Sequence, residues 1–301
     1  MSFKSFQSKV LLFGEYAAIH KGKALTIPYG RFAGQLVLPH HCVESDKDSQ
    51  SHREIKAFGH YLMEYCGDFL DLAALKNDID RGLYFDSSIP QGFGLGSSGA
   101  LCAALYDRYR KVKEELPPKD LKHIFILMES HFHGLSSGID PLISYLGTPL
   151  LFESDDRISP VEIFSERPGP GALFLVNTGQ TRRTGALVNL FLEKCKSSSF
   201  ESFFKEKIIP VTDRSIRSFL AKENESFWEN FMELSAYQFE CFGPMIPRLL
   251  GPLWRRGLDE GHFALKLCGA GGGGVFLGAA RDFQRARKRF YEYEIRPICF
   301  F

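Results

Sequence analysis

The segment from Pro90 to Ala100 reads PQGFGLGSSGA and combines glycines with serines directly before a helical pattern. Glycines let a backbone approach an anion closely, and the amides at a helix start present the positive end of the helix dipole. A phosphate group is therefore the expected ligand, and the hydroxyl of Ser98 in the first helical turn can bind a magnesium ion. The expected phosphate-binding positions are Pro90, Gly92, Gly94, Leu95, Gly96, Ser97, Ser98 and Gly99. A glycine-rich turn with serine N-caps is the structural alternative.

This loop follows neither of the two common nucleotide-binding patterns. It lacks the GxxxxGK[ST] spacing, and no acidic residue ends a second strand at the distance that a GxGxxG dinucleotide fingerprint needs. The sequence therefore predicts a phosphate loop of a different kind.

Two carboxylates further along the chain are candidates for catalysis. Glu129 and Asp140 are 11 residues apart, with Gly134 and the run 136–138 (Ser-Ser-Gly) between them. This spacing lets a helix end and a tight loop form, so that both carboxylates face one cleft. Each residue taken alone is an ordinary solvated surface acid, and Lys9 taken alone is a lysine in solvent at a strand edge.

Two segments in the second half of the chain have unusual composition. The run 269–274 holds five glycines in six positions, which indicates either a loop that approaches a ligand or a permissive hairpin turn. The segment 177–188 contains Arg182, and a guanidinium binds a carboxylate through paired hydrogen bonds. The alternative is a helix N-terminus with Arg182 exposed and Thr184 as its cap.

The elements that position these residues mix strands with grouped helices, which favours an α+β fold over a doubly wound sheet. Strands are predicted at Lys9–Phe13, Ala24–Pro28, Gln35–Leu38, Gly82–Asp86, Pro149–Phe152, Ala172–Asn177, Phe263–Cys268 and Val275–Gly278. Helical spacing occurs at Ser51–Cys66, Leu101–Val112, Lys119–His131, through most of Thr184–Trp254, and at Phe283–Tyr291. Polar, turn-rich stretches at 153–160 and 166–171 predict two domains, 1–160 and 161–301.

The composition excludes several classes of protein. The formal net charge is +1, so no strong global field favours nucleic acid or an anionic membrane. Seven scattered cysteines without CxxC spacing suggest neither a disulfide framework nor a zinc site, and a cytoplasmic location is expected. No window is apolar enough to form a signal core or a membrane span.

Three segments resemble one known family, in the correct order. The Pro90 loop is very similar to the PxxxGLGSSAA signature of the GHMP kinases, and Leu267–Gly274 (LCGAGGGG) resembles their C-terminal glycine motif. Ser8–Glu15 (SKVLLFGE) resembles their N-terminal motif in the form typical of the mevalonate kinase branch. The stretches ESHFHGLSSGIDPLISYLG and NTGQTRRTGALV resemble further segments of that branch.

The resemblance implies a role for each candidate residue. Glu129 and Ser98 would hold Mg²⁺, Asp140 would face the hydroxyl of the acceptor, and Lys9 would supply an ammonium beside it. The residues implied at the acceptor are Glu15, Tyr16, Arg182, Thr184, Gly271 and Gly272. Tyr16 departs from the pattern because that branch usually carries histidine there, although a tyrosine can still donate a hydrogen bond.

The resemblance also implies a fold and an activity. The fold would be the two-domain GHMP kinase fold, with an N-terminal ribosomal-protein-S5-like α/β domain, a C-terminal ferredoxin-like α+β domain and a cleft between them. The activity would be transfer of phosphate from ATP to mevalonate or a related hydroxy acid. Another GHMP acceptor, such as phosphomevalonate or a sugar, and an inactive nucleotide-binding member are the alternatives. The oligomeric state stays open, with a homodimer among the options.

Overall fold

The computed structural model describes residues 3–20, 22–39, 46–134, 136–153, 157–163, 169–182 and 184–301. The chain forms two compact units. The first unit comprises Met1–Val10, Ile27–Pro90 and Leu95–Thr148, and the second comprises Leu11–Thr26, Gln91–Gly94 and Pro149–Phe301. The strands β1 (Ser5–Phe13) and β2 (Ala24–Val37) each contribute residues to both units. The domains 1–160 and 161–301 remain a prediction, since compact units need not coincide with folding domains.

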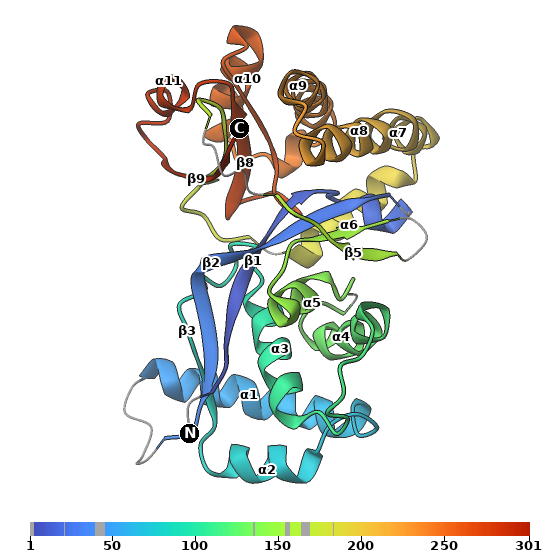
Figure 1. Ribbon diagram of the computed structural model, residues 1–301, viewed down its shortest axis with the longest axis vertical. Coiled ribbons are helices and arrows are strands. Elements are labelled where there is room, and N and C mark those ends of the chain that lie inside the picture. The colour runs from blue at the N-terminus through green and yellow to red at the C-terminus, as the bar shows by residue number, and fades with distance from the viewer. Residues whose placement is uncertain are drawn as a thin grey trace. The chain divides into compact units, whose positions relative to one another are not determined.

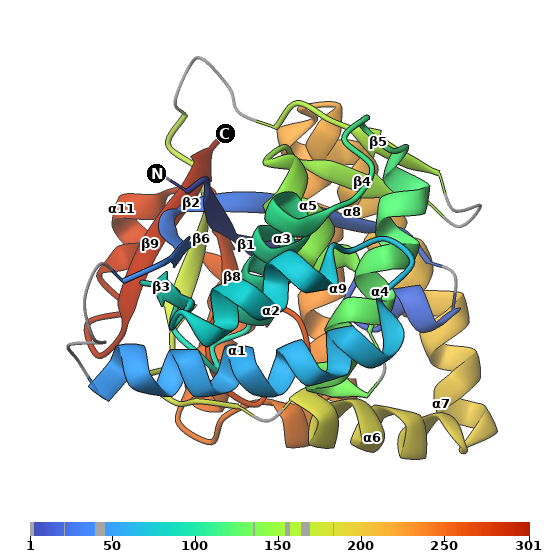
Figure 2. The same cartoon turned by 90° about the horizontal axis from the view of Figure 1, so that it is seen from below.

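Helices make up most of the first unit. The elements after β2 are α1 (Asp46–Tyr65), α2 (Leu72–Asp80), β3 (Tyr84–Ser87), α3 (Ser97–Tyr109), α4 (Pro118–His133) and α5 (Ile139–Leu146). The strand β3 pairs antiparallel with the end of β2, from Gly34 opposite Ser87 to Val37 opposite Tyr84. The helix α3 contacts α4 and α5 (Figure 1), and α1 contacts α2 and α4 (Figure 2).

The helix α3 is the centre of this unit. Its residues from Gly99 to Tyr106 are all buried, as a helix with small and apolar side chains on every face predicts. Small residues let neighbouring backbones come close, and a Cβ atom added to Gly99 would lie 2.7 Å from the carbonyl carbon of Asp140. The close approach of α3 and α5 therefore depends on Gly99, where the family signature has alanine.

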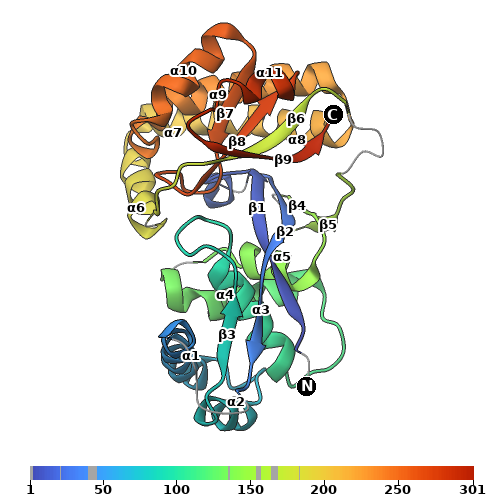
Figure 3. The same ribbon diagram turned by 90° about the vertical axis from the view of Figure 1, so that its left-hand side faces the viewer.

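The second unit is built on an antiparallel sheet. Its strands lie in the order β7 (Phe263–Leu267), β8 (Val275–Ala280), β6 (Ala172–Asn177) and β9 (Glu294–Phe300), as Figure 3 shows. Every residue of β7 and β8 is buried, so both faces of these strands are covered. The short strands β4 (Leu150–Phe152) and β5 (Ile158–Pro160) pair with each other, and β4 also pairs with the beginning of β2.

Helices cover this sheet. The helical elements of the second unit are η1 (Ala17–His20), α6 (Thr184–Cys195), α7 (Ser198–Phe203), η2 (Phe204–Ile208), α8 (Ile209–Leu220), α9 (Asn224–Cys241), η3 (Gly243–Met245), α10 (Leu250–Glu260) and α11 (Phe283–Arg287). Both α9 and α10 contact β7. Among the described residues, no helix is long and apolar enough to cross a membrane.

The expected α+β class is confirmed, and several element predictions were wrong in detail. The two strands predicted at 24–28 and 35–38 are one strand, β2, because Gly34 lies against the ring of Phe85 instead of making a turn. The last helix ends at Arg287, and a final strand, β9, follows it. The helix α2 was not predicted.

We expect Gly99→Ala to destabilise the protein, although alanine has the higher helix propensity by about 1 kcal/mol. The added Cβ atom would meet backbone atoms of Asp140 and Pro141 at less than 3 Å, and overpacking of this kind costs about 1–3 kcal/mol. The matched control is Gly251→Ala in α10, where a Cβ atom would meet nothing within 4 Å. Urea unfolding of both variants checks this, and a Gly99→Ala protein as stable as the control would contradict it.

Candidate active site

The first unit places Lys9 beside Asp140. The Lys9 side chain in β1 is only 6% exposed, and its Nζ lies 2.9 Å from Oδ2 of Asp140, whose own side chain is 31% exposed. The backbone amide of Lys9 donates to the carbonyl oxygen of Leu95 at 2.9 Å. Lys9 is therefore not the solvated edge lysine of the alternative interpretation, and its ammonium is fixed between the glycine-serine loop and the start of α5.

The start of α3 supplies the features expected of a phosphate site. Gly96 is the N-cap in the left-handed conformation, with φ of 79°, and as a glycine it makes no side-chain cap hydrogen bond. A Cβ atom at Gly96 would lie 2.8 Å from Cγ of Lys9, so only glycine leaves room for the lysine side chain beside the start of α3. The amides of the first turn carry the positive end of the helix dipole and lie beside Lys9, which favours an anion at this place.

Glu129 lies on α4 with its side chain turned inward. It is 4% exposed, and its carboxylate accepts hydrogen bonds from Ser98 Oγ at 3.2 Å and Ser136 Oγ at 2.5 Å. Burial, followed by repulsion from Asp140, raises the pKa of the Glu129 carboxyl to about 8, while Ser136, Lys9 and Ser98 oppose the rise. The positive charge of Lys9 therefore offsets only part of the cost of a negative charge at Glu129.

Glu129 and Ser98 form a donor set that fits magnesium. Both offer oxygen ligands within hydrogen-bond distance of each other, and a divalent cation would relieve the charge imbalance at Glu129. No group of three or more His, Cys, Asp or Glu side chains able to hold a metal occurs among the residues that the structure describes. Magnesium commonly takes one or two protein ligands and completes its shell with water and phosphate oxygens, so two ligands suffice.

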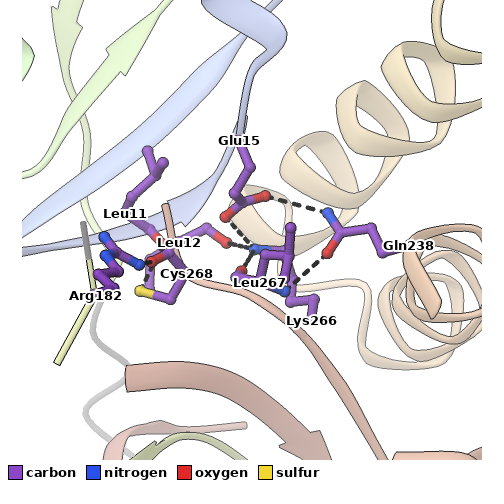
Figure 4. A network of polar contacts seen from close by, with 8 residues as sticks. All are labelled: Leu11, Leu12, Glu15, Arg182, Gln238, Lys266, Leu267 and Cys268. Carbon is purple, nitrogen blue, oxygen red and sulfur yellow. Dashed lines mark hydrogen bonds and ion pairs between the residues drawn. The ribbon is translucent and has the colours of Figure 1, made fainter. Parts of the chain in front are cut away.

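The second unit buries Glu15, the first of the expected acceptor residues. Its carboxylate forms an ion pair with Lys266 and accepts from Nε2 of Gln238 at 3.3 Å (Figure 4). Burial raises the pKa of the Glu15 carboxyl, and the Lys266 ammonium is the largest effect that opposes the rise. Both oxygens of Glu15 are thus engaged within the protein, and its direct contact with an acceptor stays a prediction.

Tyr16 follows Glu15 in a strained backbone conformation, with φ of 60°. Its hydroxyl donates to the carbonyl oxygen of Ala270 in the glycine run at 2.8 Å, and its ring stacks on Phe191 at a centroid distance of 4.3 Å. Burial raises the pKa of the Tyr16 hydroxyl, which stays protonated as a donor. The residue that replaces the usual histidine therefore ties the N-terminal motif to the C-terminal glycine motif.

Arg182 is held by glycines from two distant segments. Its Nη1 donates to the carbonyl oxygen of Cys268 at 2.9 Å, and its backbone amide donates to the carbonyl oxygen of Gly92 at 2.9 Å. A Cβ atom at Gly94, or one at Gly269, would overlap the guanidinium. The first part of the glycine-serine loop, Gln91–Gly94, thus packs within the second unit against the segment that carries Arg182.

The remaining acceptor candidates are less well defined. Thr184 is the first residue of α6, but its side chain, like the whole of Arg183, lies outside the described residues. The Gly272 amide donates to the carbonyl oxygen of Met245 at 2.6 Å, and a Cβ atom at Gly271 would collide with that same oxygen. These two glycines thus already have a packing role.

Each unit gathers part of the expected set. The first unit brings together Lys9, Leu95, Gly96, Ser97, Ser98, Gly99, Glu129 and Asp140, and the second brings together Glu15, Tyr16, Gly92, Gly94, Arg182, Gly271 and Gly272. Sequence reasoning missed Lys266, Gln238 and Ser136, which contact these residues. The signal for Lys266 was a lone lysine within the apolar run FALKLC.

Comparisons with known proteins show which proteins this chain is similar to. Residues 56–148 match the family model described as the GHMP kinases N terminal domain. A mevalonate kinase from Pyrococcus horikoshii is 26% identical over 93% of this chain and 89% of that protein. One from Archaeoglobus fulgidus is 25% identical over 91% of this chain and 90% of that protein.

Solved structures share the fold. The L. major mevalonate kinase in complex with R-mevalonate aligns with a TM-score of 0.65 and 17% identity, covering 99% of this chain and 97% of that chain. The Streptococcus pneumoniae phosphomevalonate kinase in complex with phosphomevalonate and AMPPNP also aligns with a TM-score of 0.65, at 15% identity, covering 99% and 100%. These matches define an ATP-dependent kinase that acts on an alcohol. Within that class, the chain has the fold of the GHMP kinases, and residues 56–148 match the N-terminal domain of that family.

The pKa of Glu129 predicts a pH-dependent stability in metal-free protein. A carboxyl whose pKa is raised from 4.5 to about 8 by folding stabilises the native state below pH 4.5, and this contribution is lost as the pH rises through about 8. The slope is at most about 1.4 kcal/mol per pH unit. We expect Glu129→Gln to remove this loss of stability between pH 5 and pH 8, as measured by urea unfolding in EDTA. Glu64→Gln, on the exposed side of α1, is the control, and identical pH profiles for wild type and Glu129→Gln would contradict the prediction.

Proposed function

We propose that the protein transfers the γ-phosphoryl group of ATP to the 5-hydroxyl of mevalonate, giving 5-phosphomevalonate for isoprenoid synthesis. The observation that carries this choice of acceptor is the guanidinium of Arg182, held by Cys268, Gly94 and Gly269. A fixed guanidinium suits a carboxylate, which mevalonate has and a sugar lacks. Four archaeal relatives that match more than 90% of this chain are named mevalonate kinases, which supports the same choice.

Asp140 and Lys9 are the residues proposed for the chemical step. The acceptor oxygen attacks the γ-phosphorus atom, its proton passes to the Asp140 carboxylate, and the bond between the γ-phosphorus and the bridging oxygen breaks to release ADP. The Lys9 ammonium, 2.9 Å from Asp140, stabilises the negative charge that develops on the acceptor oxygen and on the transferring group.

The phosphate groups of ATP are assigned to the glycine-serine loop, with the amides at the start of α3 as donors. Ser98 and Glu129 would hold Mg²⁺, which neutralises phosphate charge when it is bound. A cytoplasmic location remains a prediction, and the six cysteines that the structure describes as free support a reducing compartment.

Phosphomevalonate is the second candidate acceptor. The phosphomevalonate kinase of Streptococcus pneumoniae matches the fold as well as the L. major mevalonate kinase does, with a TM-score of 0.65 in each case. A guanidinium binds phosphate as readily as carboxylate, so Arg182 fits either group. Measured turnover of mevalonate and of phosphomevalonate has to distinguish the two acceptors.

The test is ATP-dependent turnover of mevalonate, phosphomevalonate, galactose and homoserine by the purified protein. We expect kcat/KM for mevalonate to exceed that for every other acceptor by about 100-fold or more, since missing polar contacts in a built site weaken transition-state binding strongly. A preference for another compound in the panel would overturn the choice of mevalonate. Magnesium-dependent ATP binding without turnover of any of them would indicate an inactive member of the family.

The role of Arg182 has its own test, with mevalonate methyl ester as a neutral analogue. Wild-type protein should prefer the acid to the ester, and Arg182→Gln should raise KM for the acid by about 10-fold or more while leaving KM for the ester little changed. Equal losses for acid and ester would show that Arg182 does not bind the carboxylate.

A further inference from the structure

We propose that Lys266 is a positioning residue for the acceptor side of the reaction, holding Glu15 and the end of β7 where Glu15 and Arg182 act. This inference rests on the proposed function of those two residues. Lys266 is itself fully buried, at 0% exposure, and we assign it no contact with substrate.

All the hydrogen-bonding capacity of the Lys266 ammonium is directed at two backbone carbonyls and one carboxylate. Its Nζ donates to Glu15, to the carbonyl oxygen of Leu12 at 2.8 Å and to that of Leu267 at 2.7 Å. An ammonium has three N–H donors, so this set uses every one of them. The lysine thereby joins the end of β1 and the residues after it to the end of β7.

Gln238 on α9 completes the arrangement from the other side. Its Nε2 donates to the second oxygen of Glu15 at 3.3 Å, and its Oε1 accepts from the backbone amide of Leu267 at 2.8 Å. Both Gln238 and Lys266 therefore hold the same two partners, the carboxylate of Glu15 and the backbone of Leu267. The position of Glu15 is fixed by two independent side chains.

The network continues to Arg182 through the next residue of the chain (Figure 4). Cys268 follows Leu267, and its carbonyl oxygen accepts from Nη1 of Arg182 at 2.9 Å. The Cys268 thiol donates to the carbonyl oxygen of Leu11 at 3.4 Å, which anchors this residue to β1. A shift of the backbone at Leu267 would therefore move the acceptor of the guanidinium hydrogen bond as well as the partner of Glu15.

A buried ion pair is a costly way to stabilise a fold, since apolar residues of similar volume often do as well or better. A buried ion pair instead defines the position of each side chain, because any other placement of either group would leave a buried charge unpaired. Lys266 and Gln238 converge on Glu15 and on the backbone of Leu267, the residue before the Cys268 carbonyl that holds Arg182. This convergence indicates that position, and not stability, is the role of Lys266.

The experiment compares Lys266→Met, which keeps the length of the side chain and removes its charge, with wild-type protein. We expect KM for mevalonate to rise about 10-fold or more, because small misplacements of binding groups reduce rates and affinities steeply, while KM for ATP changes less than about twofold. Gln238→Met, which leaves the ion pair intact, should give a smaller rise in the same parameter. If Lys266→Met does not fold, the Gln238→Met protein still tests the positioning role through the same KM for mevalonate.

Ser235→Ala is the matched control, because it lies three residues before Gln238 on α9. Its hydroxyl is fully buried and accepts a hydrogen bond from Nε1 of Trp254 at 2.8 Å, so the variant loses a buried polar contact in the same unit. This control should lower the melting temperature without changing either KM. A Lys266→Met protein that behaves like Ser235→Ala, or whose KM for ATP rises as much as that for mevalonate, would overturn the positioning role.

A double variant tests whether Lys266 acts through Glu15. If it does, adding Glu15→Gln to Lys266→Met should raise KM for mevalonate little further, and independent effects that multiply would contradict this. The proposed function is tested first and separately, by turnover of wild-type protein. If wild type prefers another acceptor, the choice of mevalonate fails, and the KM comparison for Lys266 is made with that acceptor.

Discussion

The ion pair between Lys9 and Asp140 is the interaction on which the first unit depends. A lysine side chain that is 6% exposed needs a counter-charge, and Asp140 supplies it at 2.9 Å only if α5 begins directly beside β1. That constraint requires α3 and α5 to approach closely, which Gly99 permits, and requires the N-cap of α3 to leave space for the lysine, which Gly96 permits. The glycines of the loop are thus as necessary to the ion pair as to a bound phosphate.

The same principle recurs in the second unit with a different pair. Lys266 and Glu15 are both buried, and the backbone carbonyls of Leu12 and Leu267 satisfy the remaining donors of the ammonium. In the first unit the pair retains some exposure at Asp140, as a group that exchanges a proton with an acceptor must. In the second unit the pair is sealed, as a pair that only fixes positions can be. Burial therefore separates a proposed catalytic pair from a proposed positioning pair.

Much of the first unit follows from local sequence. The apolar periodicity of α1, α3 and α4 and the glycine-serine loop before α3 are visible in the chain, and the structure has helices and a loop there. The contact between Glu129 and Ser98 was expected from the family resemblance alone, since neither residue by itself differs from a surface polar group.

What could not be predicted depends on contacts between distant segments. Nothing in the sequence around Gly34 shows that a phenylalanine ring lies against it, so β2 was divided into two strands. The final strand β9 is formed by pairing with β6, which lies more than 100 residues earlier in the chain. The local sequence pattern does not reveal such a distant pairing. Likewise, Tyr16 and the Ala270 carbonyl that accepts its hydrogen bond are 254 residues apart in the chain, so no local pattern predicts their contact.

A double-mutant cycle on Lys9 and Asp140 tests the central claim most directly. The two residues are proposed to act as one unit in the transfer of phosphate, so Lys9→Met, Asp140→Asn and the double variant should each lower kcat by a similar factor, about 1,000-fold or more. Folding of each variant is verified by its melting temperature and by binding of an ATP analogue. Losses that multiply in the double variant, or a single variant that retains most of its turnover, would contradict the account.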